Sequence, residues 1–367
     1  MDNKKIRAIG AGILVAVWLV LTGFGWFAPA KEISEAERRK LDQMPEITLE
    51  SLWEGRFMGK FEDYTLDQFP LRDTFRTLKA LFHYNALQQS DNNGIYMADG
   101  YAAKVEYPYD QESVDHATKR FNDFYNRYLK DAGSQVYMAV VPDKGYYLAQ
   151  PNGYLAMDYG AMFDSLQAQM PWATHIDLTE LLSYEDYYRT DTHWRQEHLL
   201  PVAQKLSTAM GVTGPNGSDF TKVKVERPFY GVYYGQAALP MESEDMYYLR
   251  SDLLEQCQVQ VEMQDQTQVY DLTKLESLDL YDIFLSGPKS LITIENPNAT
   301  TDRELVIVRD SFGSSIAPLL VQDYAKVTLI DIRYQKLELL GRYANFENAD
   351  VLFLYSTLVL NNSETIQ

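Results

Sequence analysis

The sequence predicts an α/β protein, an α/β/α sandwich around a parallel sheet, preceded by a transmembrane helix. Two features of the chain predict this fold. From residue 136 onwards, short apolar runs alternate with stretches of helical periodicity, and one long uncharged segment lies near the N-terminus. With 367 residues, 46% of them apolar, the chain has enough material for one large domain or two ordinary domains.

Buried strands are expected where several apolar residues follow one another without a polar gap. Such runs lie at residues 136–141, 175–178, 305–308, 327–332 and 351–355. Helical periodicity lies between or after them, at residues 196–210, 314–322 and 335–343. Because parallel strands need a crossover connection, which is usually a helix, this alternation favours a parallel sheet.

The uncharged segment covers residues 8–30, which are 23 residues without a charged side chain. As a helix it would be about 35 Å long, enough for the ~30 Å hydrocarbon core of a bilayer. Three basic residues precede it, so the positive-inside rule predicts a cytoplasmic N-terminus and an extracytoplasmic chain after Lys31. The alternative is a cleaved signal peptide, because the sequence A-P-A at residues 28–30 has the small-x-small form of a cleavage site.

The composition excludes several classes of partner and site. The net charge is −19, and because residues 1–31 carry +3, the exported part carries −22. A field of that sign disfavours nucleic acid and anionic lipid headgroups as partners. Cys257 is the only cysteine, so neither an intramolecular disulfide nor a four-cysteine zinc site can form.

We expect four parts along the chain. Residues 1–31 form a cytoplasmic tip and the membrane anchor, and residues 32–135 form a helical segment that packs on the catalytic domain. Residues 136–220 and 298–367 form the α/β domain itself. Residues 221–297 break the alternation of strands and helices, and we interpret them as a β-rich insertion.

The first candidate catalytic group is Asp191-Thr192-His193-Trp194. In extended backbone, residues two apart point to the same face, so the Asp191 carboxylate can reach the His193 imidazole. A carboxylate in that place fixes the tautomer of a histidine that acts as a general base. The alternative is structural: Asp191 would cap the helix expected from residue 196, and His193 would lie at its edge.

The second candidate group is Asp310-Ser311-Phe312-Gly313, directly after the apolar run at residues 305–308. A buried strand that turns into a helix places the Ser311 hydroxyl at the carboxyl edge of the sheet, where ligands bind in open α/β folds. Gly313 permits close approach of the backbone, and amides at the start of the helix can hold an oxyanion. The alternative is that Ser311 is only a helix N-cap.

Together the two groups predict a Ser-His-Asp triad in which Ser311 is the nucleophile, His193 the base and Asp191 the carboxylate that orients the base. The order of these residues disfavours two common groups of serine hydrolases. In α/β-hydrolases the histidine follows the serine, and ordinary SGNH esterases have the same order. Here the last histidine is His198.

A metal site is the main competing use of the histidines. His193 and His198 are five residues apart, which turns them about 140° from each other on a helix. The sequence has no H-E-x-x-H, no P-loop and no dinucleotide-binding glycine pattern. It therefore predicts catalysis with neither a metal ion nor a cofactor.

With these residues the chain resembles the DHHW-motif family of Gram-positive bacteria, which is SGNH-hydrolase-like and related to the alginate O-acetyltransferases. The resemblance rests on Thr190-Asp191-Thr192-His193-Trp194 together with Asp310-Ser311-Phe312. Weaker matches are Pro142-Asp143-Lys144 and Asp331-Ile332-Arg333-Tyr334. Thr192 stands in place of the first histidine of the family name, as it does in the acetyltransferase branch.

The resemblance implies the same triad, a permuted order of the SGNH motifs, and further candidate site residues. Arg333 and Tyr334 would line the site, with the alternative that they are the polar end of a strand. Gly313 and Gly287 would lie near the oxyanion. The sequence S-G-P-K around Gly287 lacks the asparagine often found there.

The function that follows is extracytoplasmic transfer of an acyl group, above all an acetyl group, to a cell-envelope or secreted polysaccharide through an acyl-serine intermediate. The resemblance implies a membrane-bound O-acyltransferase as the acyl donor, and residues 8–30 would contact the lipid bilayer. Two alternatives stay open. One is a carbohydrate esterase with the same triad, and the other is a catalytically inactive glycan-binding or scaffold protein.

Overall fold

The structure is a computed structural model that describes residues 3–263 and 265–367. The chain forms two compact units. They are the residues up to Asn92 with Tyr234–Pro240, and Asn93–Tyr233 with Met241–Gln367. The domain limits predicted from the sequence, including those of the segment 32–135, stay a prediction.

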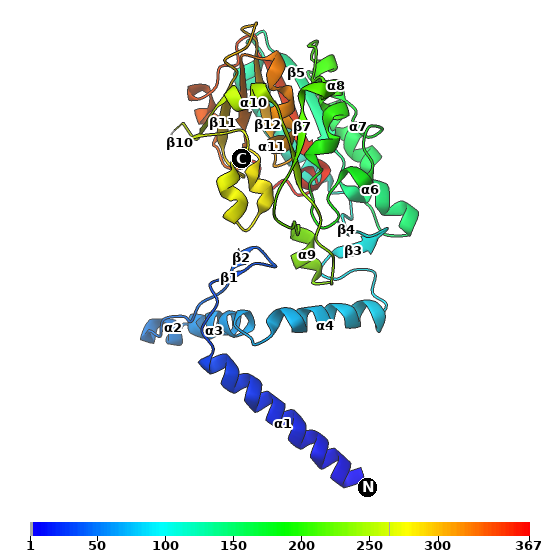
Figure 1. The fold of residues 1–367 in the computed structure, drawn as a ribbon, viewed down its shortest axis with the longest axis vertical. Coiled ribbons are helices and arrows are strands. Elements are labelled where there is room, and N and C mark those ends of the chain that lie inside the picture. Colours follow the sequence, from blue (N-terminus) through cyan, green and yellow to red (C-terminus); the bar gives the residue numbers. More distant parts are fainter. Residues whose placement is uncertain (1–2, 264) are drawn as a thin grey trace. The chain divides into compact units, whose positions relative to one another are not determined.

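The first unit consists of helices and one short hairpin. Its elements are α1 (Asn3–Phe27), β1 (Ile33–Ser34), β2 (Arg39–Lys40), α2 (Leu49–Trp53), α3 (Arg56–Asp67) and α4 (Arg72–Asn85) (Figure 1). α1 takes up most of the predicted uncharged segment, and its stretch Lys4–Gly25 is long and apolar enough to cross a membrane. A helix of this kind near the N-terminus is a membrane span or a signal sequence.

The second unit is built on one sheet, which has eight strands among the described residues. Across the sheet they are β10 (Asp265–Thr267), β9 (Gln258–Val261), β11 (Leu291–Glu295), β13 (Lys326–Ile330), β12 (Glu304–Arg309), β14 (Asp350–Ser356), β5 (Gln135–Val141) and β6 (Thr174–Ile176). The strands from β13 to β6 run parallel, and the other three extend the β13 edge in antiparallel pairing. This confirms the predicted α/β fold with a mostly parallel sheet.

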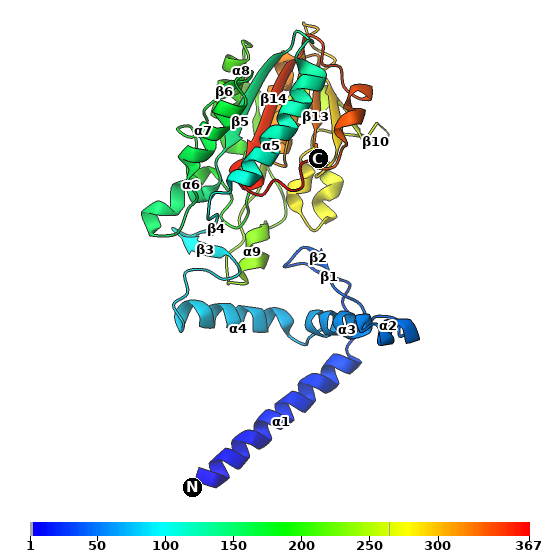
Figure 2. The same cartoon turned by 180° about the vertical axis from the view of Figure 1, so that it is seen from behind.

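Successive residues of the central strands point to opposite faces of the sheet and enter two separate cores. Leu305 and Ile307 of β12 belong to the first core, and Val306 and Val308 belong to the second. Because both faces are covered, these strands are apolar throughout, which made them recognisable in the sequence. The covering helices are α8 (Leu200–Ala209) and α11 (Gly313–Ile316) in the first core, and α5 (Gln111–Phe124) and α7 (Tyr159–Gln169) in the second. Figure 2 shows α5 lying along the sheet.

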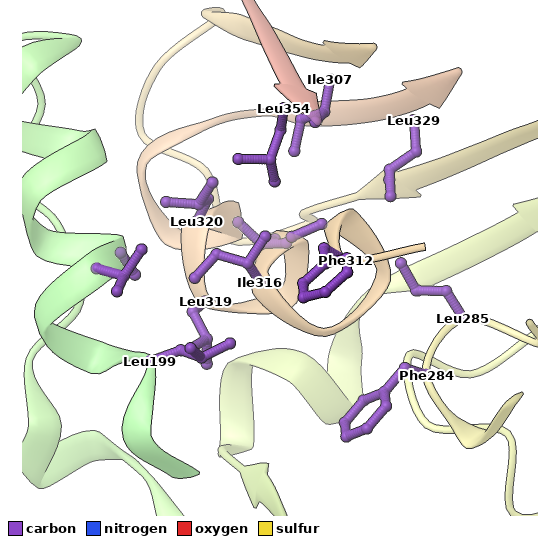
Figure 3. Close-up of a cluster of buried hydrophobic side chains, with 14 of the residues drawn as sticks. Leu199, Phe284, Leu285, Ile307, Phe312, Ile316, Leu319, Leu320, Leu329 and Leu354 are labelled. Atoms are coloured by element: carbon purple, nitrogen blue, oxygen red, sulfur yellow. The ribbon is translucent and has the colours of Figure 1, made fainter. Parts of the chain in front are cut away.

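The chain after Ser311 is part of the first core. Figure 3 shows Ile316, Leu319 and Leu320 of this stretch in one cluster with Ile307 and Leu354 of the sheet, with Leu319 directed toward Leu199, and these side chains are fully buried. Their burial fixes the path by which the chain leaves β12.

The remaining strands and α-helices of the described chain form two hairpins and four short helices. They are β3 (Ile95–Ala98) with β4 (Tyr101–Lys104), β7 (Thr221–Lys224) with β8 (Tyr247–Arg250), α6 (Lys144–Leu148), α9 (Val232–Ala237), α10 (Asp252–Gln256) and α12 (Thr357–Leu360).

Three predicted helices are shorter or more tightly wound than expected. The helix predicted from residue 196 opens as a 3₁₀ turn, Gln196–His198, and α8 then starts just before Pro201. α11 ends at Ile316, and a 3₁₀ helix with Pro318 in its first turn continues to Asp323. Proline has no amide hydrogen to donate, so it begins a helical turn but does not continue one. A third 3₁₀ helix, Leu337–Arg342, replaces the helix predicted at residues 335–343.

The stretch 221–297 contributes to the main sheet. β9, β10 and β11 come from it, and β11 pairs with β13 along five residues, from Leu291 opposite Ile330 to Glu295 opposite Lys326. A sheet can grow at its edge by antiparallel addition without changing the parallel strands beside it. The limits of the predicted insertion therefore stay a prediction.

Candidate active site

Ser311 lies in the turn between β12 and α11. Asp310 ties this turn to the end of β14: Oδ1 accepts the Phe312 amide at 3.0 Å, and Oδ2 accepts the Ser356 amide and hydroxyl at 2.8 and 2.7 Å. Asp310 and Phe312 are buried, whereas Ser311 is half-buried. The turn thus exposes its serine and hides the residues on either side.

Gly313 permits the sharp start of α11. A Cβ atom at this position would lie 2.7 Å from the Cβ of Arg309, so a larger residue would push α11 away from β12. The Gly313 amide donates to the Asp310 carbonyl, and the Ser314 amide donates to the Ser311 carbonyl, both at 3.1 Å. In the described chain no hydrogen bond is present for the Ser311 amide, which distinguishes it from the three amides that follow.

The Asp191 carboxylate is fully buried and accepts hydrogen bonds on both oxygens. Oδ1 lies 2.6 Å from His193 Nδ1 and 3.0 Å from the His193 amide, and Oδ2 accepts the Val232 amide at 2.8 Å. On the other side of the imidazole, His193 Nε2 lies 2.8 Å from Ser311 Oγ. The structure therefore joins Asp191, His193 and Ser311 in one hydrogen-bonded chain.

These contacts determine where the protons lie. An ionised carboxylate only accepts, so we assign the imidazole proton to His193 Nδ1, which leaves the Nε2 lone pair facing the Ser311 hydroxyl. The 3₁₀ turn at Gln196–His198 has Arg195 at its N-cap and no side-chain cap, so Asp191 does not serve as the helix cap considered above. Chemically, this arrangement can take the proton of Ser311 as its oxygen attacks a carbonyl carbon.

The imidazole is held by two aromatic rings. Tyr281 stacks on it with the ring centroids 3.8 Å apart and an interplanar angle of 11°, and Phe312 packs at 5.1 Å. The Tyr281 hydroxyl donates to Ser315 Oγ at 2.7 Å, and Trp194 Nε1 lies 2.9 Å from the same oxygen. Burial raises the pKa of Tyr281, so this phenol stays neutral. The stack and the shared serine fix the imidazole relative to α11.

Glu244 anchors the chain just before Asp191. Its Oε1 accepts the Thr190 amide and hydroxyl at 2.9 and 2.8 Å, and its Oε2 accepts the Arg189 amide at 2.9 Å. Arg195 forms an ion pair with Oε2 at 2.6 Å. One buried carboxylate thus binds both ends of the short segment that carries Asp191 and His193.

Lys144 supports the same segment with the opposite charge. Its ammonium donates to the Tyr188 carbonyl at 2.7 Å and lies 5.1 Å from the centre of the Tyr233 ring. Burial lowers the pKa of Lys144 to about 7, and the negative charges of Asp191 and Glu244 act against that change. The segment is therefore held between a buried cation and a buried anion.

Gly231 packs directly on the backbone of Asp191. A Cβ atom at residue 231 would lie 2.3 Å from the Asp191 Cα, which no real side chain tolerates. The Gly231 amide donates to Thr190 Oγ1 at 2.8 Å. Only glycine allows this approach, which also aligns the next amide, that of Val232, with the Asp191 carboxylate.

The other predicted site residues are engaged elsewhere. Arg333 forms an ion pair with the fully buried Asp331 at 2.7 Å, and Tyr334 is 57% exposed. Gly287 has φ of +82°, and its amide donates to the Phe284 carbonyl at 3.3 Å. No hydrogen bond or ion pair in the described chain joins Arg333, Tyr334 or Gly287 to Ser311. A role for them in the site stays a prediction.

Sequence reasoning missed four residues that shape this site: Glu244, Lys144, Gly231 and Tyr281. Lys144 lies in the Pro142-Asp143-Lys144 match, which was a weak signal, and Gly231 was visible only as one glycine of an irregular stretch. Within the described chain, no group of three or more His, Cys, Asp or Glu residues is placed to hold a metal ion.

Comparison with known proteins adds a family and a fold. The family described as DHHW protein matches residues 179–330. A DHHW family protein from Eubacterium siraeum superposes with a TM-score of 0.61 at 19% identity, covering 75% of this chain and 95% of its own. Bacillus cereus PatB1, solved with a sulfonyl adduct, gives 0.57 at 17% identity, covering 72% and 95%. At such identities the similarity shows the fold.

More remote similarity extends to the O-acetyltransferase domain of Pseudomonas putida AlgJ. It covers 73% of this chain and 92% of that domain at 14% identity, with a TM-score of 0.43. No curated protein matches the chain by sequence.

Proposed function

We propose that this chain, which carries a DHHW-family domain at residues 179–330, transfers an acyl group to a hydroxyl of a cell-envelope or secreted polysaccharide outside the cytoplasm. The acyl group we expect is acetyl. The observation that supports this most strongly is the hydrogen-bonded chain from the buried Asp191 carboxylate through His193 to the half-buried Ser311 hydroxyl. A serine oxygen next to an oriented, neutral imidazole is the arrangement that nucleophilic acyl transfer requires.

In the first step Ser311 Oγ attacks the carbonyl carbon of an acyl donor while His193 Nε2 takes the hydroxyl proton. The bond from that carbon to the leaving group then breaks, and His193 gives its proton to the leaving group. The acyl group is now an ester of Ser311. In the second step a polysaccharide hydroxyl gives its proton to His193 and attacks the same carbonyl carbon, the bond to Ser311 Oγ breaks, and Oγ takes the proton back.

Asp191 and the turn amides stabilise the charges that appear in these steps. The buried Asp191 carboxylate stabilises the imidazolium form of His193. The tetrahedral intermediate carries a negative oxygen, which needs hydrogen-bond donors beside Ser311. The amides of Phe312, Gly313 and Ser314 already donate hydrogen bonds within the turn. We therefore propose the Ser311 amide as the oxyanion donor of this turn, and not the amide of Gly313.

The chain also needs a supply of acyl groups. We propose that α1 anchors it in the cell membrane, with the catalytic unit outside, and that a membrane-bound O-acyltransferase delivers the acyl group from cytoplasmic thioesters. Protease added to intact cells should then digest the chain beyond Lys31, while the undigested chain stays with membranes in high salt. Release of a chain that begins near Lys31 would support the signal-peptide alternative, and recovery from the cytosol would contradict export.

The activity test uses the full-length chain in detergent micelles with 4-nitrophenyl acetate and a mixture of neutral oligosaccharides. We measure 4-nitrophenol release, acetylated oligosaccharide and free acetate. The native chain should acetylate oligosaccharide, and Ser311→Ala should reduce all three products to the uncatalysed rate. Its melting temperature should change little, because the hydrogen bond described for the Ser311 hydroxyl is the one to His193 Nε2, and losing one such bond costs about 0.5–1.5 kcal/mol. Ser218→Ala, at an exposed serine of the same unit, is the matched control.

Each other outcome has a definite meaning. Acetate without acetylated sugar indicates the carbohydrate esterase, which uses water as acceptor through the same acyl-serine. No ester turnover by a folded native chain indicates the inactive glycan-binding alternative. Undiminished turnover by Ser311→Ala contradicts the nucleophile assignment. A sulfonyl fluoride should inactivate the native chain by trapping Ser311, and Bacillus cereus PatB1, which has the same fold, has been solved with a sulfonyl adduct.

A further inference from the structure

The first unit leaves a row of large apolar side chains exposed on α4. They are Leu71, which precedes the helix, and Phe75, Leu78 and Phe82 within it, and they are 65%, 42%, 55% and 57% exposed. The three side chains within α4 are spaced three and four residues apart, which keeps them within an arc of about 60° on a helix of ~3.6 residues per turn, and Leu71 comes directly before the helix with a left-handed backbone. We call these four side chains the α4 stripe.

The opposite side of α4 is already engaged with the rest of its unit. Arg72 and Arg76 form ion pairs with Glu37 at 2.6 and 3.1 Å, and Arg76 also donates to the Gly235 carbonyl at 2.8 Å. Ala80 on that side is fully buried. A helix of a soluble protein buries its apolar side and exposes its charges. α4 exposes its large apolar side chains while two of its charged residues, Arg72 and Arg76, are engaged in ion pairs; Asp73 and Lys79 are exposed. The α4 stripe is therefore suited to a medium other than water.

A second exposed apolar group lies on α2. Leu49, Leu52 and Trp53 are three and one residues apart, so they share one side of a helical turn, and they are 89%, 46% and 94% exposed. Tryptophan is enriched where proteins meet the boundary between lipid headgroups and acyl chains. A side chain of this size that is almost fully exposed supports the same kind of surface.

Contacts within the first unit connect the α4 stripe to the end of the apolar helix α1. The turn between α3 and α4 contains Gln68 and Pro70. A Cβ atom at Gly25 of α1 would lie 3.4 Å from Pro70 Cδ, and Gln68 exchanges two hydrogen bonds of 2.8 Å with the backbone of Lys31. The α4 stripe therefore begins one residue after the point where the chain touches the last turn of α1.

Local charge agrees with a lipid surface. Residues 56–85, which comprise α3 and α4, carry five basic and four acidic side chains, a net charge of +1, whereas the chain after residue 31 carries −22 in total. The repulsion from anionic headgroups that applies to the exported part as a whole does not apply to these two helices.

We infer that the α4 stripe, together with Trp53, lies in the headgroup boundary of the same lipid bilayer that α1 spans. α4 would then be an interfacial helix, lying on the membrane in which α1 is anchored. The inference rests on the membrane anchor proposed above and is independent of the acyl-transfer chemistry. It gives the chain a second contact with lipid, which begins at Trp53, 23 residues beyond the end of the apolar segment at residue 30.

The test places one fluorophore at a time on the full-length chain in phosphatidylcholine vesicles. Cys257, which is buried, is replaced by serine, and single cysteines carry an environment-sensitive label. Phe82→Cys and Asp73→Cys form a matched pair: both positions are exposed on α4, and nine residues place them about 180° apart. Leu14→Cys in α1 reports whether the anchor is in the bilayer. Vesicles with bromines on the lipid acyl chains serve as the quencher.

We expect brominated lipid to quench the labels at residues 82 and 14 several-fold more than the label at residue 73. Quenching at residue 14 but not at residue 82 would overturn this inference and leave the anchor intact. A blue-shifted label at residue 82 that brominated lipid does not quench would show that a protein covers the α4 stripe, which also overturns it. Failure to quench at residue 14 would overturn the anchor and this inference together. Leu78→Cys repeats the measurement should Phe82→Cys not fold.

Discussion

Two segments bring the proposed catalytic side chains together, and they are held by different means. The turn with Ser311 leaves a strand in the middle of the sheet, and the apolar residues that follow it are buried in the first core. The segment with Asp191 and His193 also packs into this core, through Tyr188 and Trp194, but it is held in addition by single buried charges, chiefly Glu244 and Lys144. The first segment is tied around its serine by the carboxylate of Asp310, whereas the second depends on ion pairs and hydrogen bonds to two further buried charges.

This difference predicts where the site is fragile. A sheet-borne turn tolerates the loss of one polar group, because its position is fixed by burial of its neighbours. A buried charge that loses its partner destabilises a protein by about 3–5 kcal/mol. Substitutions around residues 188–195 should therefore change both rate and stability, whereas substitution of Ser311 should change the rate alone.

The largest effect in the polar segment is expected for Asp191→Asn. Asparagine cannot stabilise the imidazolium form of His193, so ester turnover should fall by about 10⁴-fold, as it does in a serine-protease triad. One of the two amides now accepted by the carboxylate, those of His193 and Val232, would face the new NH₂ group. We therefore expect a lower melting temperature as well, by an amount that leaves the variant folded during the assay.

The measurement is the rate of 4-nitrophenyl acetate turnover together with a thermal melt. A tenfold lower rate corresponds to a loss of ~1.4 kcal/mol of transition-state stabilisation. A folded Asp191→Asn variant that keeps more than about a tenth of the native rate would refute the triad as assigned.

Gly231→Ala should show how closely the rate depends on the Asp191 backbone. The new methyl group would lie 2.3 Å from the Asp191 Cα, so the backbone segments around residues 191 and 231 must move apart by about 1 Å. A misplacement of that size can reduce a rate by ~10²-fold, and overpacking costs about 1–3 kcal/mol. Gly59→Ala is the matched control, because residue 59 has no neighbour within 4 Å of the added methyl group. Equal rates for the two variants would contradict this prediction.

Glu244→Gln tests the anchor without changing its shape. The amide nitrogen of glutamine would face either the Arg189 amide or the Thr190 amide, both of which need an acceptor. Unfolding in denaturant should show a loss of about 2–4 kcal/mol, below the range for a fully enclosed pair because Arg195 keeps some contact with water. Glu242→Gln, at an exposed site two residues away, should stay within about 0.5 kcal/mol of the native chain. A Glu244→Gln variant as stable as this control would show that the anchor is dispensable.

The smallest effect is a pH dependence that Lys144 contributes to stability. Its pKa is about 7 in the folded chain, against 10.5 for an ordinary lysine. Between these values the unfolded chain binds more protons than the folded chain, so the contribution of Lys144 to stability rises with pH from about 7 to about 10. The native chain should gain stability relative to Lys144→Met between pH 7 and pH 9, by at most about 1.4 kcal/mol per pH unit. Parallel pH profiles for the two proteins would contradict this.

The same comparison explains how much the sequence could predict. β5, β12, β13 and β14 were recognisable because strands buried on both faces consist of apolar residues throughout. Asp191 and His193 were recognisable as a pair because they are two residues apart. We expected them to lie beside Ser311, which is 118 residues from His193, and the structure has this contact. The catalytic role of the three residues stays a prediction.

The polar anchors could not be predicted because no local pattern marks them. Glu244 binds amides 54 and 55 residues away, and Lys144 binds a carbonyl 44 residues away. A buried charge looks like a surface charge in a sequence, since only the folded chain shows its burial. The place of the edge strands β9 and β11 in the sheet could not be predicted for a related reason: it depends on the pairing of β11 with β13 and β9, and periodicity carries no information about strand partners.

The most direct measurement of the proposed chemistry is the mass of the peptide that contains Ser311 after brief exposure to an activated acetyl ester without an acceptor. The full-length chain is quenched in acid, digested and sequenced by mass spectrometry, with sulfonyl fluoride as a second, stable trap. We predict one acetyl or sulfonyl group on Ser311, strongly reduced in His193→Ala and absent from that peptide in Ser311→Ala. Modification at a different residue, or ester turnover by a chain in which neither reagent modifies Ser311, would contradict an acyl-serine intermediate at this site.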